Sequence, residues 1–156
     1  MEITKDIKYV GVNDHDIDLF EGQYDVRENG MAYNSYVVLG ERKVAVMDAV
    51  DARFVGEWLE NLETALDGRT PDYLVVHHME PDHSAGIAAF AKKYPEAQIV
   101  ASAMAFKIMA AYFGTDFSDR RVIAKEGAKL DLGGQELTFI GAMNVHWPEV
   151  LFSYDS

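Results

Sequence analysis

Short apolar runs alternate with segments of helical periodicity along the chain, and this alternation predicts a mixed α/β fold. Residues 32–39 and 43–48 are apolar runs on either side of Gly40-Glu41-Arg42, a pattern typical of a β-hairpin. Residues 72–77 contain a continuous Tyr-Leu-Val-Val, which predicts a strand that is buried on both faces. We therefore expect a sheet with at least one central strand.

Helical spacing first occurs over residues 52–66, where apolar residues recur every three or four positions and glutamates fill the other face. A second helix is expected from Ser84 to Tyr94, because Pro95 cannot continue it. A third is expected over residues 102–113, ended by Gly114. The first of the three is expected to be an amphipathic surface helix.

The remaining apolar segments complete a strand–helix–strand–helix unit and a second hairpin. Residues 98–101 form the strand between the second and third helices. Residues 128–140 alternate polar and apolar around Gly133-Gly134, which predicts a two-residue hairpin turn. The chain has 156 residues, 49% of them hydrophobic, and no repeat or linker divides it, so one compact domain is expected.

Charge and cysteine content narrow the possible chemistry. The formal net charge of -12 opposes loose binding to nucleic acid or to an anionic membrane, so neutral or basic partners are expected. The absence of cysteine excludes disulfides, iron–sulfur clusters and thiolate-bound zinc, so any metal needs nitrogen and oxygen ligands. Neither a signal peptide nor a membrane-spanning run is visible, which favours a cytoplasmic location.

Four potential metal ligands lie within six residues, directly after the buried strand 72–77. They are His78, Glu80, Asp82 and His83. In extended backbone, residues two apart face the same way, so His78 and Glu80 can reach one metal together. Pro81 disfavours helix at Glu80, so the chain should turn there and present the next two ligands to a second metal. The alternative is a polar loop without a metal, with Asp82 or Ser84 capping the next helix.

This hexapeptide fits the H-x-[EH]-x-D-H signature of the metallo-β-lactamase superfamily, and its glutamate form resembles the flavodiiron proteins, also called A-type flavoproteins. Residues 30–36 look like the family's early strand, residues 77–86 its ligand loop and residues 144–149 the segment that holds the next ligand. The resemblance implies a metallo-β-lactamase-like αββα sandwich. Residues 1–156 would be its N-terminal portion, a mixed sheet with flanking helices, without the flavodoxin-like domain that binds FMN.

Carried over by position, the resemblance implies that His78, Glu80 and His146 bind the iron nearer the flavin. Asp82 and His83 would bind the second iron, although the histidine at the latter position is not a direct ligand in every family member. Hydrolytic relatives have a histidine where this chain has Glu80. A carboxylate makes the site richer in oxygen, which favours iron over zinc.

Residues outside this ligand set have two interpretations each. Trp147 would flank the substrate pocket or pack in the core. Asp48 would orient a ligand histidine or form a turn at a strand end. His77 should face away from His78 and be structural, and His15, in an acidic loop, should be exposed.

The family requires two further ligands after His146, an aspartate that bridges the metals and a final histidine. Asp155 lies in a stretch that resembles the strand before the bridging aspartate, so it is not that ligand. We therefore expect three ligands to one metal, at most two to the other, and completion of the centre outside these residues. A cut fragment, a truncated or split gene product and a self-associating half-domain all fit this expectation.

The resemblance implies part of an oxidoreductase that reduces dioxygen to water or nitric oxide to nitrous oxide at two irons. Electrons would arrive through FMN from a redox donor such as rubredoxin. A head-to-tail homodimer is implied, because the family's FMN reaches the irons from a neighbouring subunit. Two other hypotheses remain open: a zinc hydrolase of the same fold acting on an ester, thioester or lactam, and a catalytically silent folded module.

Overall fold

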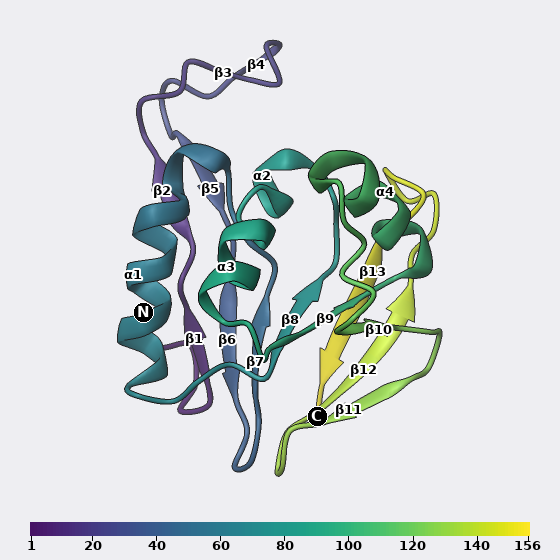
Figure 1. Cartoon of the computed structure of the whole chain (residues 1–156). Helices are drawn as coiled ribbons and strands as arrows, with labels where there is room; N and C mark the ends of the chain where they lie inside the picture. The colour runs from purple at the N-terminus through teal and green to yellow at the C-terminus, as the bar shows by residue number, and fades with distance from the viewer.

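The computed structural model describes residues 1–156 and contains a six-stranded mixed sheet at its centre (Figure 1). In spatial order its strands are β1 (Ile7–Tyr9), β6 (Tyr36–Leu39), β7 (Val44–Met47), β8 (Tyr73–Val76), β9 (Gln98–Ala101) and β10 (Arg121–Ile123). Strands β7 to β10 run parallel, while β1 and β6 form an antiparallel edge. The predicted hairpin of residues 32–48 and the buried strand of residues 72–77 are both confirmed.

Helices cover one face of this sheet (Figure 1). They are η1 (Ala52–Phe54), α1 (Val55–Leu66), α2 (Pro81–Ser84), α3 (Ile87–Lys93) and α4 (Ala103–Phe113). The amphipathic pattern of α1 buries Trp58 and Leu62 completely in the larger apolar cluster, against strand residues such as Val46 and Leu74. No helix combines the length and apolar composition needed to cross a membrane.

A three-stranded antiparallel sheet packs on the other face. It consists of β11 (Lys129–Asp131), β12 (Glu136–Gly141) and β13 (Leu151–Asp155). Phe139 and Leu151 pack in a smaller apolar cluster with Val75 and Val100 of the central sheet. The molecule therefore has three layers, helices, sheet and sheet, which are three of the four layers of an αββα sandwich. Its fold matches the N-terminal portion predicted from the sequence.

The turn between β11 and β12 follows the prediction from Gly133-Gly134. Both glycines have φ near +81°, the left-handed conformation that a type I′ turn requires at its two central positions. The backbone N–H of Leu132 donates to the carbonyl of Gln135 at 2.9 Å and closes the turn. Local sequence chemistry thus sets the register of this hairpin.

Two short antiparallel pairs lie in the chain between β1 and β6 of the central sheet. β2 (Val12–Asp14) pairs with β5 (Met31–Tyr33), and β3 (Leu19–Phe20) pairs with β4 (Tyr24–Asp25). The β3–β4 pair projects from the body of the molecule as an arm (Figure 1). The apolar run at residues 32–39 is therefore two strands rather than one.

Buried contacts lie where the apolar run of residues 32–39 and the second predicted helix are interrupted. Between β5 and β6, the buried Ser35 accepts from Trp58 Nε1 and donates to the carbonyl of Asp48, both at 2.9 Å. The prediction of one helix from Ser84 to Tyr94 is wrong in its continuity, because α2 ends at Ser84 and α3 starts at Ile87. A Cβ at Gly86 would lie 2.8 Å from the Trp58 ring, so close packing with α1 occupies the break.

Candidate metal centre

The cluster of predicted ligands begins at the carboxyl end of β8, an inner parallel strand where α/β sheets commonly place their sites. Glu80 is extended, with φ -60° and ψ 141°, and stands just before α2. Pro81 is the first residue of that helix, where its missing N–H and fixed φ cost nothing. The chain therefore turns at Glu80, as the proline predicts, and Asp82 and His83 lie in a helical turn.

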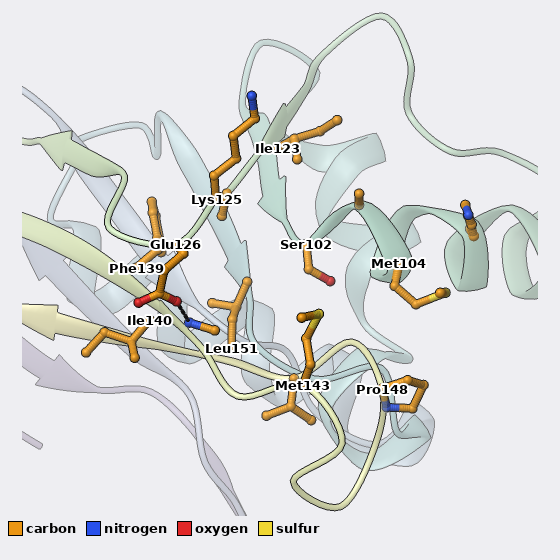
Figure 2. A pocket seen from close by; sticks show the side chains of 15 residues that line it. Ser102, Met104, Ile123, Lys125, Glu126, Phe139, Ile140, Met143, Pro148 and Leu151 are labelled. Atoms are coloured by element: carbon orange, nitrogen blue, oxygen red, sulfur yellow. Dashed lines mark hydrogen bonds between the residues drawn. The ribbon is translucent and has the colours of Figure 1, made fainter.

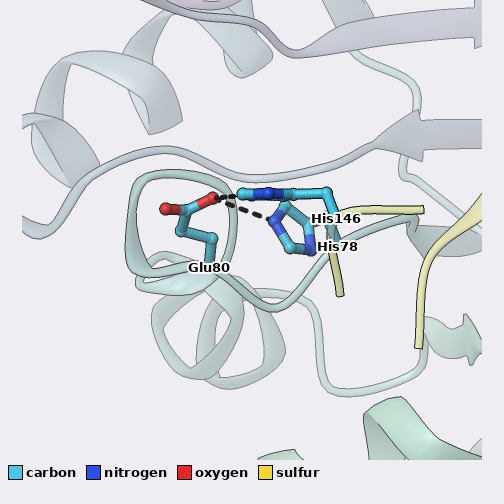
Figure 3. Close-up of side chains that lie close together, drawn as sticks. All are labelled: His78, Glu80 and His146. Carbon is cyan, nitrogen blue, oxygen red and sulfur yellow. Dashed lines mark hydrogen bonds and ion pairs between the residues drawn. The ribbon is translucent and has the colours of Figure 1, made fainter. Parts of the chain in front are cut away.

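Three predicted ligands converge on one point (Figure 3). The Nε2 atoms of His78 and His146 each lie 3.0 Å from the same oxygen, Oε2 of Glu80. One ligand atom from each of the three side chains lies within 4.8 Å of the other two. Two nitrogens and one oxygen in this arrangement fit the donor set of a divalent transition metal.

His146 reaches this point from the connection between β12 and β13. Its backbone has φ +71°, and Asn144 has φ +65°, so two residues without a glycine's freedom adopt the left-handed region within three positions. Strained backbone of this kind is concentrated at functional sites. The ring of Trp147 packs edge-on against the ring of His78, with centroids 5.1 Å apart. Trp147 thus packs against a predicted ligand, and its place beside a substrate pocket stays a prediction.

The electrostatics of the cluster centre on Glu80. Burial acts to raise the pKa of this carboxyl, but hydrogen bonds with Glu21, His146 and His78 outweigh it and lower the pKa to about 2. The hydrogen bond to Glu80 in turn raises the pKa of His146. Glu21, at the tip of the β3–β4 arm, has a raised pKa because it shares a hydrogen bond with Glu80. An anionic oxygen is therefore held between two imidazoles, which suits a bound cation.

Asp82 and His83, the predicted ligands of the second metal, lie beside this cluster but not within it. His83 Nε2 is 3.6 Å from Asp82 Oδ2. Asp82 Oδ1 and His83 Nδ1 are both buried without a hydrogen-bond partner. Burial raises the pKa of Asp82, and the charge of Glu80 acts in the same direction. These two buried atoms can each bind a metal and lie on adjacent residues. They therefore fit a second metal site that has part of its ligand set.

His77 faces a separate network, as the alternation along the strand predicts. Its Nδ1 donates to Asp48 Oδ2 at 2.8 Å, and its Nε2 lies 2.7 Å from Ser153 Oγ on β13. Asp48 has φ +56° directly after β7, and its Oδ1 accepts from the backbone N–H of His77 at 2.7 Å. Asp48 therefore forms the strand-end turn and orients His77, which is not a predicted ligand. His15 is exposed, as expected.

Sequence reasoning assigned no role to Glu149, although it is 1% exposed and touches the cluster directly. Its Oε1 accepts from His78 Nδ1 at 2.7 Å and from the backbone N–H of Met79 at 2.9 Å. The only sequence signal was a carboxylate three residues after His146, which spacing alone does not distinguish from a surface residue.

Three cavities lie near the cluster, and the smallest, of about 310 Å³, is lined by Glu80, Asp82 and the arm residue Glu21. The first of the other two, of about 430 Å³, is lined by both histidine networks, including His77, His78, His83 and His146. The second, of about 500 Å³, is mostly apolar and lies between the start of α4 and the 142–150 segment (Figure 2). None of the predicted site residues lines this second cavity. The first cavity borders His78, His83 and His146, and the smallest borders Glu80 and Asp82, so both open onto predicted metal ligands.

Comparisons with known proteins agree with this geometry. A family model described as ODP family beta lactamase matches residues 31–156. A nitric oxide reductase of Moorella thermoacetica is 35% identical over 153 residues, which cover 97% of this chain and 38% of that protein. The chain spans between 24% and 38% of the length of the curated relatives it matches.

Solved structures show the same relationship. The rubredoxin oxygen:oxidoreductase of Desulfovibrio gigas has a TM-score of 0.89 and 30% identity, and the match covers 99% of this chain and 38% of that one. The flavodiiron protein of Giardia intestinalis also has a TM-score of 0.89, with 26% identity. The resemblance to the N-terminal, metallo-β-lactamase-like part of flavodiiron proteins is confirmed.

Proposed function

The chain belongs to the ODP beta-lactamase family, and from that membership we propose that it forms the metal-binding N-terminal part of a flavodiiron oxidoreductase. The reaction we propose for the whole protein is reduction of dioxygen to water or of nitric oxide to nitrous oxide. The observation that carries this proposal is the meeting of His78, Glu80 and His146 at one carboxylate oxygen. A relative named as a nitric oxide reductase and another named as an oxygen oxidoreductase support the two substrates.

The residues present fit iron. The chain has no cysteine, so its ligands are imidazole nitrogens and carboxylate oxygens, and Glu80 adds an oxygen where a hydrolytic site has a third nitrogen. Iron, when bound, supplies electrons to the diatomic substrate, and FMN on the parent protein replenishes them. His78, Glu80 and His146 would hold one iron, while Asp82 and His83 would contribute to the second.

The other side chains of the site orient ligands and limit access. Trp147 holds one face of the His78 ring by edge-on packing, so the ring cannot rotate freely. The arm residue Glu21 lies beside Glu80 and lines a cavity with it on the side of the β3–β4 pair. A diatomic molecule is small enough to enter the 430 Å³ cavity without displacing either element.

We propose further that a redox donor such as rubredoxin supplies electrons to the whole protein. The FMN-bearing part would come from a neighbouring subunit, so the whole protein would be a homo-oligomer. The name of the Desulfovibrio gigas relative, a rubredoxin oxygen:oxidoreductase, supports the donor. A cytoplasmic location fits a reaction that depends on soluble donors of this kind.

Metal selectivity tests this proposal against the zinc hydrolase. The chain would be expressed in iron-rich medium, purified without oxygen and assayed for bound metal. We expect iron in the wild-type chain, and a shift toward zinc in Glu80→His, which recreates the ligand set of hydrolytic relatives. Zinc alone in the wild type, together with turnover of an ester or thioester, would overturn the assignment. No bound metal in either protein would support the silent module instead.

A further inference from the structure

Glu149 is a fully buried carboxylate whose hydrogen bonds all go to the ligand loop. The side chain lies in the 142–150 segment, and its two donors, His78 Nδ1 and the N–H of Met79, are 71 and 70 residues away in the chain. Burying a carboxylate is costly unless hydrogen bonds compensate its charge. One donor belongs to His78, a predicted metal ligand, and the other to the next residue, Met79. The buried charge therefore lies directly beside the predicted site.

The bond to Nδ1 determines which nitrogen of His78 is free for a metal. An imidazole whose Nδ1–H donates to a carboxylate carries its lone pair on Nε2. In this structure His78 Nε2 is the atom that faces Glu80 and lies beside the His146 ring. Glu149 therefore bonds to the ring at Nδ1, and the nitrogen that is available to a metal, Nε2, lies on the other side of the ring.

Glu149 also connects the two segments that supply the ligands. His146 is three residues earlier in the same segment, and its side chain is 60% exposed, so the protein core does not fix that ring by packing. The carboxylate of Glu149 bonds to residues 78 and 79 from within the core. This link fixes the end of the 142–150 segment, just after His146, against the ligand loop before any metal is present.

The second oxygen of Glu149 indicates how metal binding would act on this link. Oε2 is buried without a hydrogen-bond partner, so the negative charge is compensated on one side only. A divalent cation on His78 Nε2 draws electron density from the ring and makes Nδ1–H a stronger donor. The bond to Glu149 then strengthens when metal binds, and Glu149 favours the metal-bound state over the metal-free state.

We propose that Glu149 is the positioning residue of the metal centre, which presents His78 Nε2 to the metal and joins the two ligand-bearing segments into one unit. This inference rests on the proposed metal centre at His78, Glu80 and His146. Glu149 itself does not bind the metal, because its carboxylate lies against Nδ1, on the side of the ring away from Glu80.

Cobalt binding by the full chain tests the proposal, with Co²⁺ absorbance as the measure of affinity and geometry. We expect Glu149→Gln, which keeps an acceptor but removes the charge, to weaken Co²⁺ binding about tenfold. Glu149→Ala should weaken it by about 10- to 100-fold and change the absorbance bands. Ser84→Ala is the matched control: its buried hydroxyl donates to the carbonyl of Met79 at 3.0 Å in the same loop but touches no ligand.

The control should lose thermal stability while its Co²⁺ affinity stays within about twofold of the wild type. Long-range ¹H–¹⁵N spectra of the zinc-loaded wild type should show His78 and His146 with protonated Nδ1 and metal-bound Nε2, and the His78 signals alone should shift in Glu149→Ala. Equal affinity and unchanged ring signals in the Glu149 variants would overturn the inference while leaving the metal centre intact. A wild-type chain that binds no Co²⁺ would instead overturn the metal centre, and the inference with it.

Discussion

Two adjacent histidines, His77 and His78, leave the end of the same strand and have different surroundings. Each ring is anchored through Nδ1 by a carboxylate, Asp48 in one case and Glu149 in the other. The difference lies at Nε2. His77 Nε2 meets the neutral hydroxyl of Ser153, whereas His78 Nε2 meets an ionised carboxylate that a second imidazole also approaches.

This difference shows how one residue type serves structure and chemistry at neighbouring positions. A hydroxyl can donate or accept, so Ser153 satisfies His77 completely and leaves no unmet charge. The oxygen of Glu80 between two rings leaves negative charge that a proton or a metal must meet. The partner of Nε2, rather than the anchor of Nδ1, separates the structural histidine from the candidate ligand.

The largest expected effect separates the two histidines by metal affinity. Four-ligand zinc sites contribute about 10–16 kcal/mol, or about 3–4 kcal/mol per ligand, so His78→Ala should weaken metal binding roughly 100- to 1,000-fold. His77→Ala should change affinity by less than about threefold, because its ring hydrogen-bonds to Asp48 and Ser153 and not to a predicted ligand. Isothermal titration with Zn²⁺ measures both. Equal losses in the two variants would show that the networks are not separate.

The converse effect is on the stability of the metal-free chain. Asp48→Ala leaves the His77 ring and N–H without their acceptor and should cost about 2 kcal/mol. That is below the value for fully buried pairs, because the Asp48 side chain is 15% exposed. Urea unfolding in the presence of a chelator measures the loss. A urea midpoint equal to that of the wild type would contradict a structural role for the Asp48–His77 pair.

A smaller effect is expected at the hydroxyl end of the same network. Ser153→Ala removes one hydrogen bond to a half-buried ring and should cost about 1 kcal/mol. Ser156→Ala, whose hydroxyl is exposed and bonds weakly at 3.5 Å, should change stability by less than about 0.5 kcal/mol. The two variants would be compared by urea unfolding. A larger loss at Ser156 would contradict the assignment.

The smallest effect is a pH dependence that belongs to His77 and Asp48. Burial lowers and the Asp48 charge raises the pKa of His77, and the net result is a raised value. Burial raises and the His77 interactions lower the pKa of Asp48, and the net result is a lowered value. The stabilisation by the His77 pair is complete below the ordinary histidine pKa of 6.5 and is lost as pH rises through the folded pKa.

The Asp48 contribution has the opposite sign: it is present above the ordinary pKa of 3.8 and is lost as pH falls through the lowered folded value. The melting temperature of the metal-free chain should therefore fall as the pH rises from 6 to 9. The fall should be smaller in Asp48→Asn over the same range. Melting curves in a chelator at several pH values check this. A steeper decline in Asp48→Asn would contradict the assignment.

Local patterns were enough to predict most of the fold. The glycine pair at 133–134, the amphipathic helix ending at Leu66 and the apolar strand before His77 each depend on neighbouring residues alone, and each was found where expected. The break at Gly86 was not predicted, because it depends on the Trp58 ring from another helix. Periodicity carries no information about such a contact.

The same division applies to the site. The ligand loop from His78 to His83 is local, so its motif could be recognised in the sequence. Glu149 and Ser153 could not be predicted, because they meet histidines that are 71 and 76 residues away. Their roles follow from the packing of the three-stranded sheet against the central sheet, which no spacing rule describes.

The distance in sequence between the ligands also sets when a metal can act during folding. Glu80 and His146 are 66 residues apart, and they meet only after β13 has docked, as when the N–H of Leu151 bonds to the carbonyl of His77. Closing so long a loop is a late event in folding. A metal ion should therefore slow the unfolding of the finished chain and leave its refolding rate unchanged, and stopped-flow measurements with and without Co²⁺ would make that order of events visible.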